Sequence, residues 1–118
     1  MPNGLPFIKL YSSDFLADIQ GLTPAERGVY ITLFCLAAEF DGPIKNDATR
    51  LARRCGVSKA AFQRLLNALI DEGKVVANDG MLRIPALAQL LADRRNRSRT
   101  ATNAARGRWN QDGEKYKQ

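Results

Sequence analysis

The chain has 118 residues, of which 45% are hydrophobic and 25% charged, as expected for one globular domain. It contains no histidine and only two cysteines, which excludes Ser-His-Asp and Cys-His catalysis and zinc sites built from histidine or from four cysteines. The net charge is +6, and the positive charge lies in the second half of the chain, which favours a polyanionic partner such as nucleic acid or an anionic membrane.

Membrane proteins and nucleotide hydrolases are disfavoured as well. The longest apolar run, from Val29 to Ala38, is too short to span a bilayer, which needs about 20 residues. The N-terminus lacks the pattern of a signal peptide, and no P-loop motif occurs. Cys35 and Cys55 lie in apolar helical patterns and are expected to be buried, inert thiols. We therefore expect a cytoplasmic binding protein that is not an enzyme, with no cofactor, no metal and no membrane contact.

Two pairs of carboxylates were considered as metal ligands. Asp14 and Asp18 share the face of a predicted helix, and Asp71 is followed directly by Glu72. Neither pair has a third oxygen ligand at a suitable spacing, as a magnesium site would need. We expect all four residues to be surface or capping charges.

The first twenty residues predict an extended arm and a short helix. Residues 1–11 contain two prolines and a glycine, which favour an irregular, extended segment. A helix is predicted over 14–20, with Ser12 or Ser13 as its cap. Its apolar residues, expected to point inward, are Phe15, Leu16 and Ile19.

A capping box marks the start of the next helix. Thr23 and Glu26 have the spacing at which each side chain accepts a hydrogen bond from the backbone of the other, and Pro24 suits the first helical position. The helix is predicted to end near Phe40, because Gly42 and the proline after it do not continue it. Its middle is apolar on nearly every side, which is typical of a helix buried by several neighbours.

Two more helices and a β-hairpin follow. A short strand is predicted at 43–45, and a helix at 48–55 is capped by Asp47 and ended by Gly56. Ser58 caps a helix at 59–72. The hairpin consists of strands at 74–77 and 81–84 around the turn at 78–80. Pro85 opens a last helix, whose apolar residues are Leu87, Leu90 and Leu91.

The spacing of Ala52, Gly56 and Phe62 is typical of a helix-turn-helix, in which the glycine supplies the left-handed turn residue. The hairpin that follows makes it a winged helix. We predict a mostly α fold, a winged helix-turn-helix with a short β-hairpin wing and a projecting basic C-terminal helix. The domain is predicted over 1–92 and the basic tail over 93–118, with little burial after residue 92 and disorder after residue 110.

The solvent side of helix 59–72 is the candidate DNA-reading surface. Lys59, Gln63 and Asn67 recur every four residues, and glutamine and asparagine can pair with adenine as arginine does with guanine. Arginines of the preceding helix and basic residues of the wing are expected to contact phosphates. The predicted contacts are Arg50, Arg53, Arg54, Ser58, Lys59, Ala60, Gln63, Arg64, Asn67, Lys74 and Arg83.

The tail adds a second basic feature. Its arginines are expected to follow the phosphate backbone, and Trp109 to stack on an unpaired base, so single-stranded DNA is a possible partner beside the favoured duplex. The alternative is a solvated tail. A membrane is less favoured, because the face opposite the arginines carries alanine. The predicted contacts in the tail are Arg94, Arg95, Arg97, Arg99 and Trp109.

An alternative use of the same fold stays open. Polar residues also cover any solvated helix, and Asp71, Glu72 and Asp79 make the end of the helix and the tip of the wing acidic. Winged helices also dock proteins. Such a module would bind its partner through exposed apolar residues of the arm, such as Phe7 or Tyr11.

Four motifs in order resemble the YdaU-like family of phage and prophage proteins. They are YSSDFLAD at 11–18, LTPAERGVYITL at 22–33, GPIKNDATRLARRCG at 42–56 and RSRTATNAARGRW at 97–109. The resemblance implies a role in replication initiation or a primosome, and it supplies no catalytic residues. Many members continue well beyond the Arg-Trp pair, whereas this chain has nine more residues, so no helicase-loading segment is expected within it.

The main hypothesis is therefore a DNA-binding protein of phage or prophage origin that acts in replication initiation. One alternative is a docking module for a helicase, a loader or a polymerase subunit. Another is a transcriptional repressor, which a stable dimer and a palindromic site would support. The sequence shows no heptad repeat, and the oligomeric state stays open.

Overall fold

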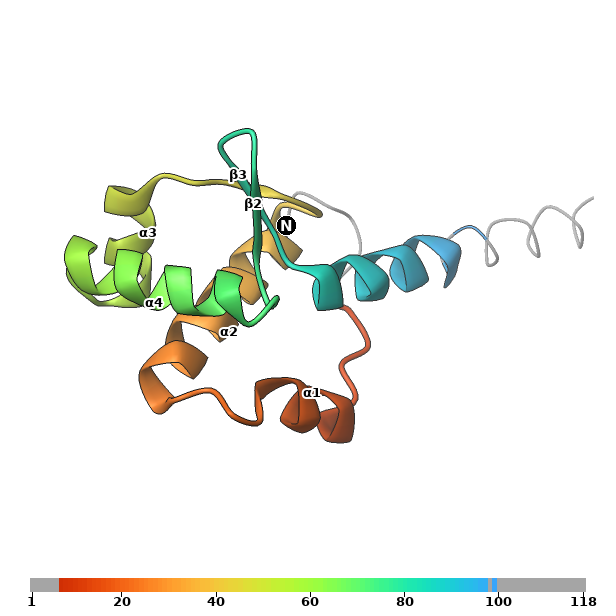
Figure 1. Cartoon of the computed structure of the whole chain (residues 1–118). Coiled ribbons are helices and arrows are strands. Elements are labelled where there is room, and N and C mark those ends of the chain that lie inside the picture. The colour runs from red at the N-terminus through yellow and green to blue at the C-terminus, as the bar shows by residue number, and fades with distance from the viewer. Residues whose placement is uncertain (1–6, 98, 100–118) are drawn as a thin grey trace, which may run out of the picture.

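The fold is a small helical domain with a three-stranded sheet at one side (Figure 1). The structure is a computed structural model, and it describes residues 7–97 and residue 99. The elements are α1 (Ser12–Ile19), α2 (Pro24–Glu39), β1 (Ile44–Lys45), α3 (Ala48–Cys55), α4 (Lys59–Asp71), β2 (Val76–Asn78) and β3 (Met81–Arg83). Residues 85–97 are helical and are called the C-terminal helix below.

The topology confirms the predicted fold class. From α2 onward the order is helix, strand, helix, helix, strand, strand, and the sheet has the antiparallel order β1-β3-β2. In this arrangement β1 joins the hairpin as its third strand, with Ile44 opposite Leu82. The chain is therefore a winged helix-turn-helix in which α3 and α4 form the helix pair and β2–β3 the wing.

Three of the predicted helix starts have the predicted caps. Thr23 and Glu26 form the capping box of α2, with N–H to oxygen distances of 2.8 and 3.2 Å. Asp47 accepts a hydrogen bond from the Arg50 amide at the start of α3, and Ser58 accepts one from the Ala61 amide at the start of α4. Each side chain satisfies an amide that the helix itself leaves unpaired.

The turn between α3 and α4 depends on a left-handed glycine. Gly56 has φ 74°, a conformation that costs other residues about 1–2 kcal/mol. Its amide donates to the Arg53 carbonyl, and the Val57 amide donates to the Ala52 carbonyl at 3.1 Å. These bonds close α3 within three residues of the next cap, so α4 starts at a fixed angle to α3.

The wing is short and tightly turned. Asn78 pairs with Met81, which leaves only Asp79 and Gly80 in the loop, and both have positive φ (53° and 73°). A two-residue loop of this kind matches the twist of the flanking strands. The strands are three residues each, one residue shorter than predicted, and the first begins at Val76 rather than at residue 74.

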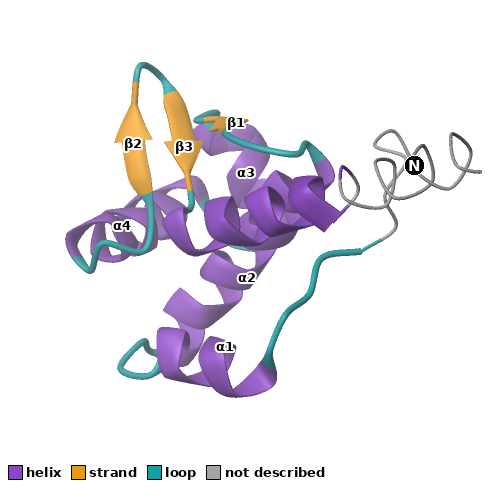
Figure 2. Cartoon of the chain, turned by 90° about the vertical axis from the view of Figure 1, so that its right-hand side faces the viewer, coloured by secondary structure: helices purple, strands orange, loops and turns teal. Residues whose placement is uncertain are grey.

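Helix α2 lies at the centre of the domain, between α1 at one end and the wing at the other (Figure 2). Its buried residues pack against α3 and α4, and the core includes Tyr30, Leu33, Phe62, Leu69 and Leu82, each 0% exposed. The prediction of a helix buried on nearly every side was partly wrong, because Cys35 is exposed and Ile31, one turn earlier, is 36% exposed. Cys55 is only half-buried.

Helix α1 differs from its prediction in two respects. It begins at Ser12, and its N-cap is Tyr11, which makes no side-chain cap. Leu16 was expected to point inward but is 64% exposed, because α1 rests on α2 through the neighbouring Phe15, whose ring lies 5.7 Å from the ring of Phe34. Ile19 packs against the core as predicted.

Asp18 was expected at the surface and instead connects three elements. Its carboxylate accepts a hydrogen bond from the hydroxyl of Tyr30 on α2 and one from the Lys74 ammonium, 3.0 Å away, at the end of α4. Burial raises the pKa of Tyr30, and the hydrogen bond to Asp18 raises it further. The carboxylate thus holds α1 against the centre of the domain and against the start of the wing.

Candidate nucleic-acid interface

The predicted contacts on α3 and α4 lie on the surface of the helix-turn-helix. All nine are exposed. Together they define what is called the HTH face below. Its members are Arg50, Arg53, Arg54, Ser58, Lys59, Ala60, Gln63, Arg64 and Asn67.

Three arginines of the HTH face come from α3. Arg50, Arg53 and Arg54 are spaced so that they share one side of the helix, while Leu51 and Ala52 are buried on the other. Within the described residues, none of the three forms an ion pair. Their guanidinium groups are therefore free to bind an external anion.

Helix α4 contributes a polar stripe and a helix N-terminus. Lys59, Gln63 and Asn67 are exposed on one side, and the opposite side is buried in the core. The positive end of the helix dipole adds to the charge of Lys59 at the first turn. In helix-turn-helix proteins this end of the second helix meets the base edges.

Acidic residues beside the HTH face limit its positive charge. Arg64 lies close enough to Glu26 for its charge to help lower the pKa of that carboxyl, after the larger effect of the hydrogen bonds with Thr23. Asp71, Glu72 and Asp79 are exposed at the far end of α4 and at the tip of the wing. The unpaired cations are thus concentrated on α3 and on the first half of α4.

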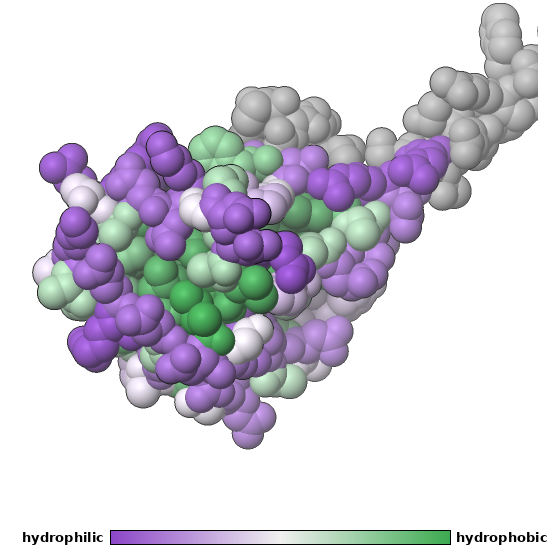
Figure 3. Space-filling model, turned by 45° about the horizontal axis from the view of Figure 1, so that its top comes forward, coloured by the Kyte–Doolittle hydropathy of each residue, from purple (hydrophilic) through white to green (hydrophobic). Residues whose placement is uncertain are grey.

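The side of the molecule that carries the wing has exposed apolar residues as well as charged ones. Figure 3 turns this side toward the viewer and shows hydrophilic residues around the edge, with hydrophobic residues gathered near the centre. Exposed apolar residues near the wing include Met81 (38% exposed) and, at the end of α2, Phe40 (67%). Both are available for contacts that DNA phosphates do not make.

The wing offers only one of the two cations that were predicted to contact phosphates. Arg83 on β3 is exposed, as a phosphate contact requires. Lys74 is partly buried and paired with Asp18, so its ammonium is not a free cation. The prediction placed Lys74 in the first strand of the wing, and no local pattern marks Asp18, 56 residues away, as its partner.

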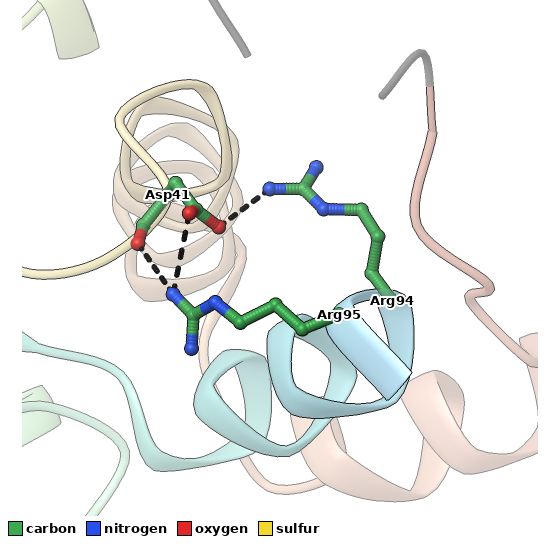
Figure 4. Close-up of polar contacts among 3 residues, drawn as sticks. All are labelled: Asp41, Arg94 and Arg95. Carbon is green, nitrogen blue, oxygen red and sulfur yellow. Dashed lines mark hydrogen bonds and ion pairs between the residues drawn. The ribbon is translucent and has the colours of Figure 1, made fainter. Parts of the chain in front are cut away.

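The structure places Arg94 in the core rather than on a free tail (Figure 4). Its Nη2 lies 2.6 Å from the Asp41 Oδ1, and the side chain is 6% exposed. Arg95 also reaches Asp41, at 3.3 Å from Oδ2 and at 3.0 Å from the carbonyl oxygen. Burial acts to raise the pKa of Asp41, but the two arginines outweigh it and hold this pKa below its usual value.

The spacing of the buried residues explains this arrangement. Leu87, Leu91 and Arg94 lie on one side of the C-terminal helix and are all buried. The buried side thus continues two residues past residue 92, where burial was predicted to end. Asp41 at the end of α2, with φ 59°, is the partner that the sequence analysis missed.

The remaining basic residues of the tail differ in their surroundings. The Arg97 guanidinium lies over the ring of Phe7, 5.5 Å from its centre, as in a cation–π contact. Arg99 is exposed and helical. Trp109 and the residues around it lie outside the described part of the chain, as does the predicted disorder after residue 110.

Residues 7–97 and 99 contain no group of three or more acidic, cysteine or histidine side chains placed to hold a metal ion. None of the helices in this part of the chain is long and apolar enough to cross a membrane. The surface features that remain are the cations of the HTH face and the apolar residues beside the wing.

The fold and the exposed helix pair define a winged helix-turn-helix protein. Residues 6–91 match the model of the family described as "Protein of unknown function (DUF1376)", and the chain belongs to this family. The match covers all of the described elements except the end of the C-terminal helix. A search of curated proteins finds no match.

Proposed function

We propose that the chain is a DNA-binding protein that places the first half of α4 in the major groove of duplex DNA. Arg53 and Arg54 would contact phosphates beside the groove, and Gln63 the edges of bases. The observation that carries the proposal is the concentration on α3 and at the start of α4 of exposed cations that form no ion pair with any residue of 7–97 and 99.

The cellular setting is a further part of the proposal. The resemblance to YdaU-like proteins favours a phage or prophage protein of replication initiation, which acts in the cytoplasm where its DNA lies. The arginines after residue 95 would add affinity that does not depend on sequence, with single-stranded DNA as a second partner. Arg94 is left out of this contact because Asp41 holds it.

Salt-dependent binding is the direct test. Fluorescence anisotropy of the full chain with a labelled duplex would be measured from 50 to 300 mM salt. Each phosphate contact contributes about 0.9 to the slope of log K against log salt, so the Arg53→Ala/Arg54→Ala double variant is expected to lower the slope by about 1.8. Affinity should fall about equally for all duplexes.

The control removes the same amount of charge elsewhere. Lys9 is exposed on the arm, and Lys9→Glu changes the net charge by two without touching the HTH face. Its slope should stay close to that of the unaltered chain. Gln63→Ala should leave the slope unchanged and alter the preference among duplex sequences. Equal slopes for the double variant and Lys9→Glu would refute the proposed face.

A further inference from the structure

A groove runs along the side of the domain between the end of α2, strand β1 and α3. Its volume is about 410 Å³, within the range of about 300–1,000 Å³ that is usual for ligand sites. The floor is apolar and consists of Leu36, Ile44 and Leu51, which are 6–8% exposed. The groove is therefore large enough to take a bulky apolar side chain.

Two exposed apolar side chains stand beside this floor. Phe40 is 67% exposed at the end of α2, and Met81 is 38% exposed on β3. Isolated apolar residues are common on protein surfaces, but an aromatic ring and a methionine that line the same groove form a contact patch. The cost of leaving them in water is recovered when an apolar group covers them.

The rim of the groove is positively charged. Lys45, Arg50 and Arg54 line it and are exposed, and none forms an ion pair within the described residues. Two acidic residues also line the groove: the carboxylate of Asp47 accepts the amide of Arg50 as the cap of α3, and Glu39 takes part in an interaction of its own. The basic side chains of the lining outnumber the acidic ones by three to two, so the net charge that faces an occupant is positive.

We propose that this groove binds an acidic segment of a partner protein, with one bulky apolar side chain of the segment on the floor and its carboxylates on the cationic rim. The charge decides between the candidate occupants. Residues 98–118 of the chain carry five basic and two acidic residues, which the rim would repel. DNA offers phosphates but no apolar side chain to cover Phe40.

A second copy of the chain is the remaining candidate occupant, and the oligomeric state of the chain distinguishes it from a partner protein. Helix α1 exposes Leu16 next to Asp14 and Phe15, so α1 of one copy would be the segment to enter the groove of another. Such an arrangement closes as a two-fold pair if the two copies exchange α1, and otherwise makes rings or open chains. Sedimentation velocity of the full chain reports it directly, and self-association that Phe40→Ser abolishes would overturn the proposal.

The experiment begins with a phage-displayed library of random 12-residue peptides selected on the immobilised full chain. We expect enrichment of peptides that combine Asp or Glu with Phe, Leu, Ile or Trp. The best of them, labelled with fluorescein, is then titrated against the chain and its variants. A selection that enriches no peptide, or enriches basic ones, would overturn the proposal.

The variants are chosen so that folding is preserved. Phe40→Ser removes an exposed side chain and is expected to weaken peptide binding about tenfold or more. Lys45→Glu should weaken it to a similar degree, and more strongly at low salt than at high salt. Leu16→Ser, an equally exposed apolar residue on α1, is the matched control and should change binding less than about twofold. Equal effects of Phe40→Ser and Leu16→Ser would refute the site.

This inference goes beyond the proposed function and does not depend on it. Arg50 and Arg54 belong both to the rim and to the HTH face, whereas Phe40 belongs only to the groove. Phe40→Ser should therefore leave duplex binding unchanged while it reduces peptide binding. Loss of duplex binding in an Arg53→Ala/Lys59→Ala variant, neither residue of which lines the groove, with peptide binding retained would be the converse result, so each hypothesis can fail alone.

Discussion

Arg94→Ala is expected to destabilise the domain by about 2 kcal/mol. Hydrogen bonds to charged groups contribute about 1.5–3 kcal/mol when buried, and the side chain of Arg94 is 6% exposed and lies 2.6 Å from Asp41. Two features keep the value in the lower part of that range. Asp41 keeps Arg95 as a partner, so its carboxylate is not left unpaired, and the buried Nε of Arg94 has no partner among the described residues.

Thermal unfolding followed by circular dichroism measures this loss. A chain of 118 residues has an unfolding entropy of about 0.25 kcal/mol/K, so 2 kcal/mol corresponds to a fall in Tm of about 8 °C. Arg95→Ala is the matched control. Its side chain is 50% exposed and its ion pair 3.3 Å long, and such pairs contribute about 0–1 kcal/mol. A fall in Tm that is equal for the two variants would refute the argument that burial makes the contact with Arg94 the stronger one.

Three other predictions concern single positions. Gly56→Ala should lower the free energy of unfolding by about 1–2 kcal/mol in urea denaturation, because φ 74° is unfavourable for alanine; an unchanged midpoint would mean that the turn relaxes. Tyr30→Phe should cost about 1 kcal/mol through the lost hydrogen bond to Asp18. Because burial and this bond raise the pKa of Tyr30, its contribution is full below the ordinary value near 10 and falls as the pH rises above it, and the difference between the spectrophotometric titrations of the unaltered chain and Tyr30→Phe should lie above this value. Cys35 should react with a thiol reagent at pH 8 before Cys55, since Cys35 is exposed while burial raises the pKa of the Cys55 thiol; the opposite order in peptide mapping would contradict the assigned exposures.

The helix starts and the turn were predictable because they depend on neighbours in the sequence. A cap such as Ser58 acts on an amide three residues away, and the Asp79-Gly80 loop needs only its own two positive φ angles. These features follow from local chemistry, and the order of the elements then left few topologies for the domain. The exposed residues of the HTH face were predictable for the same reason, since the periodicity of α4 separates its buried side from its polar side.

The pairings between distant segments were not predictable from this sequence. Asp18 meets Lys74, and Asp41 meets Arg94, at separations of 56 and 53 residues. The local sequence around a charged residue is the same whether its side chain lies in solvent or against a partner. The sequence therefore does not mark these four residues as paired. The groove was missed for a similar reason, because it combines residues of α2, β1, α3 and β3 that have no common motif.

If the chain binds DNA as proposed, the length of the exposed stripe on α4 limits how many base pairs one copy of the chain can contact. From Lys59 to Asn67 the helix rises about 12 Å, which corresponds to about 3.5 base pairs of DNA at 3.4 Å each. A site of about four specified base pairs occurs by chance roughly once in every 256 positions, so it recurs many times even in a small genome. Under this proposal, the base contacts of one copy alone would not specify a unique site in a genome. A second copy a full helical turn away along the duplex, or a partner protein already bound beside the site, would supply the remaining specificity.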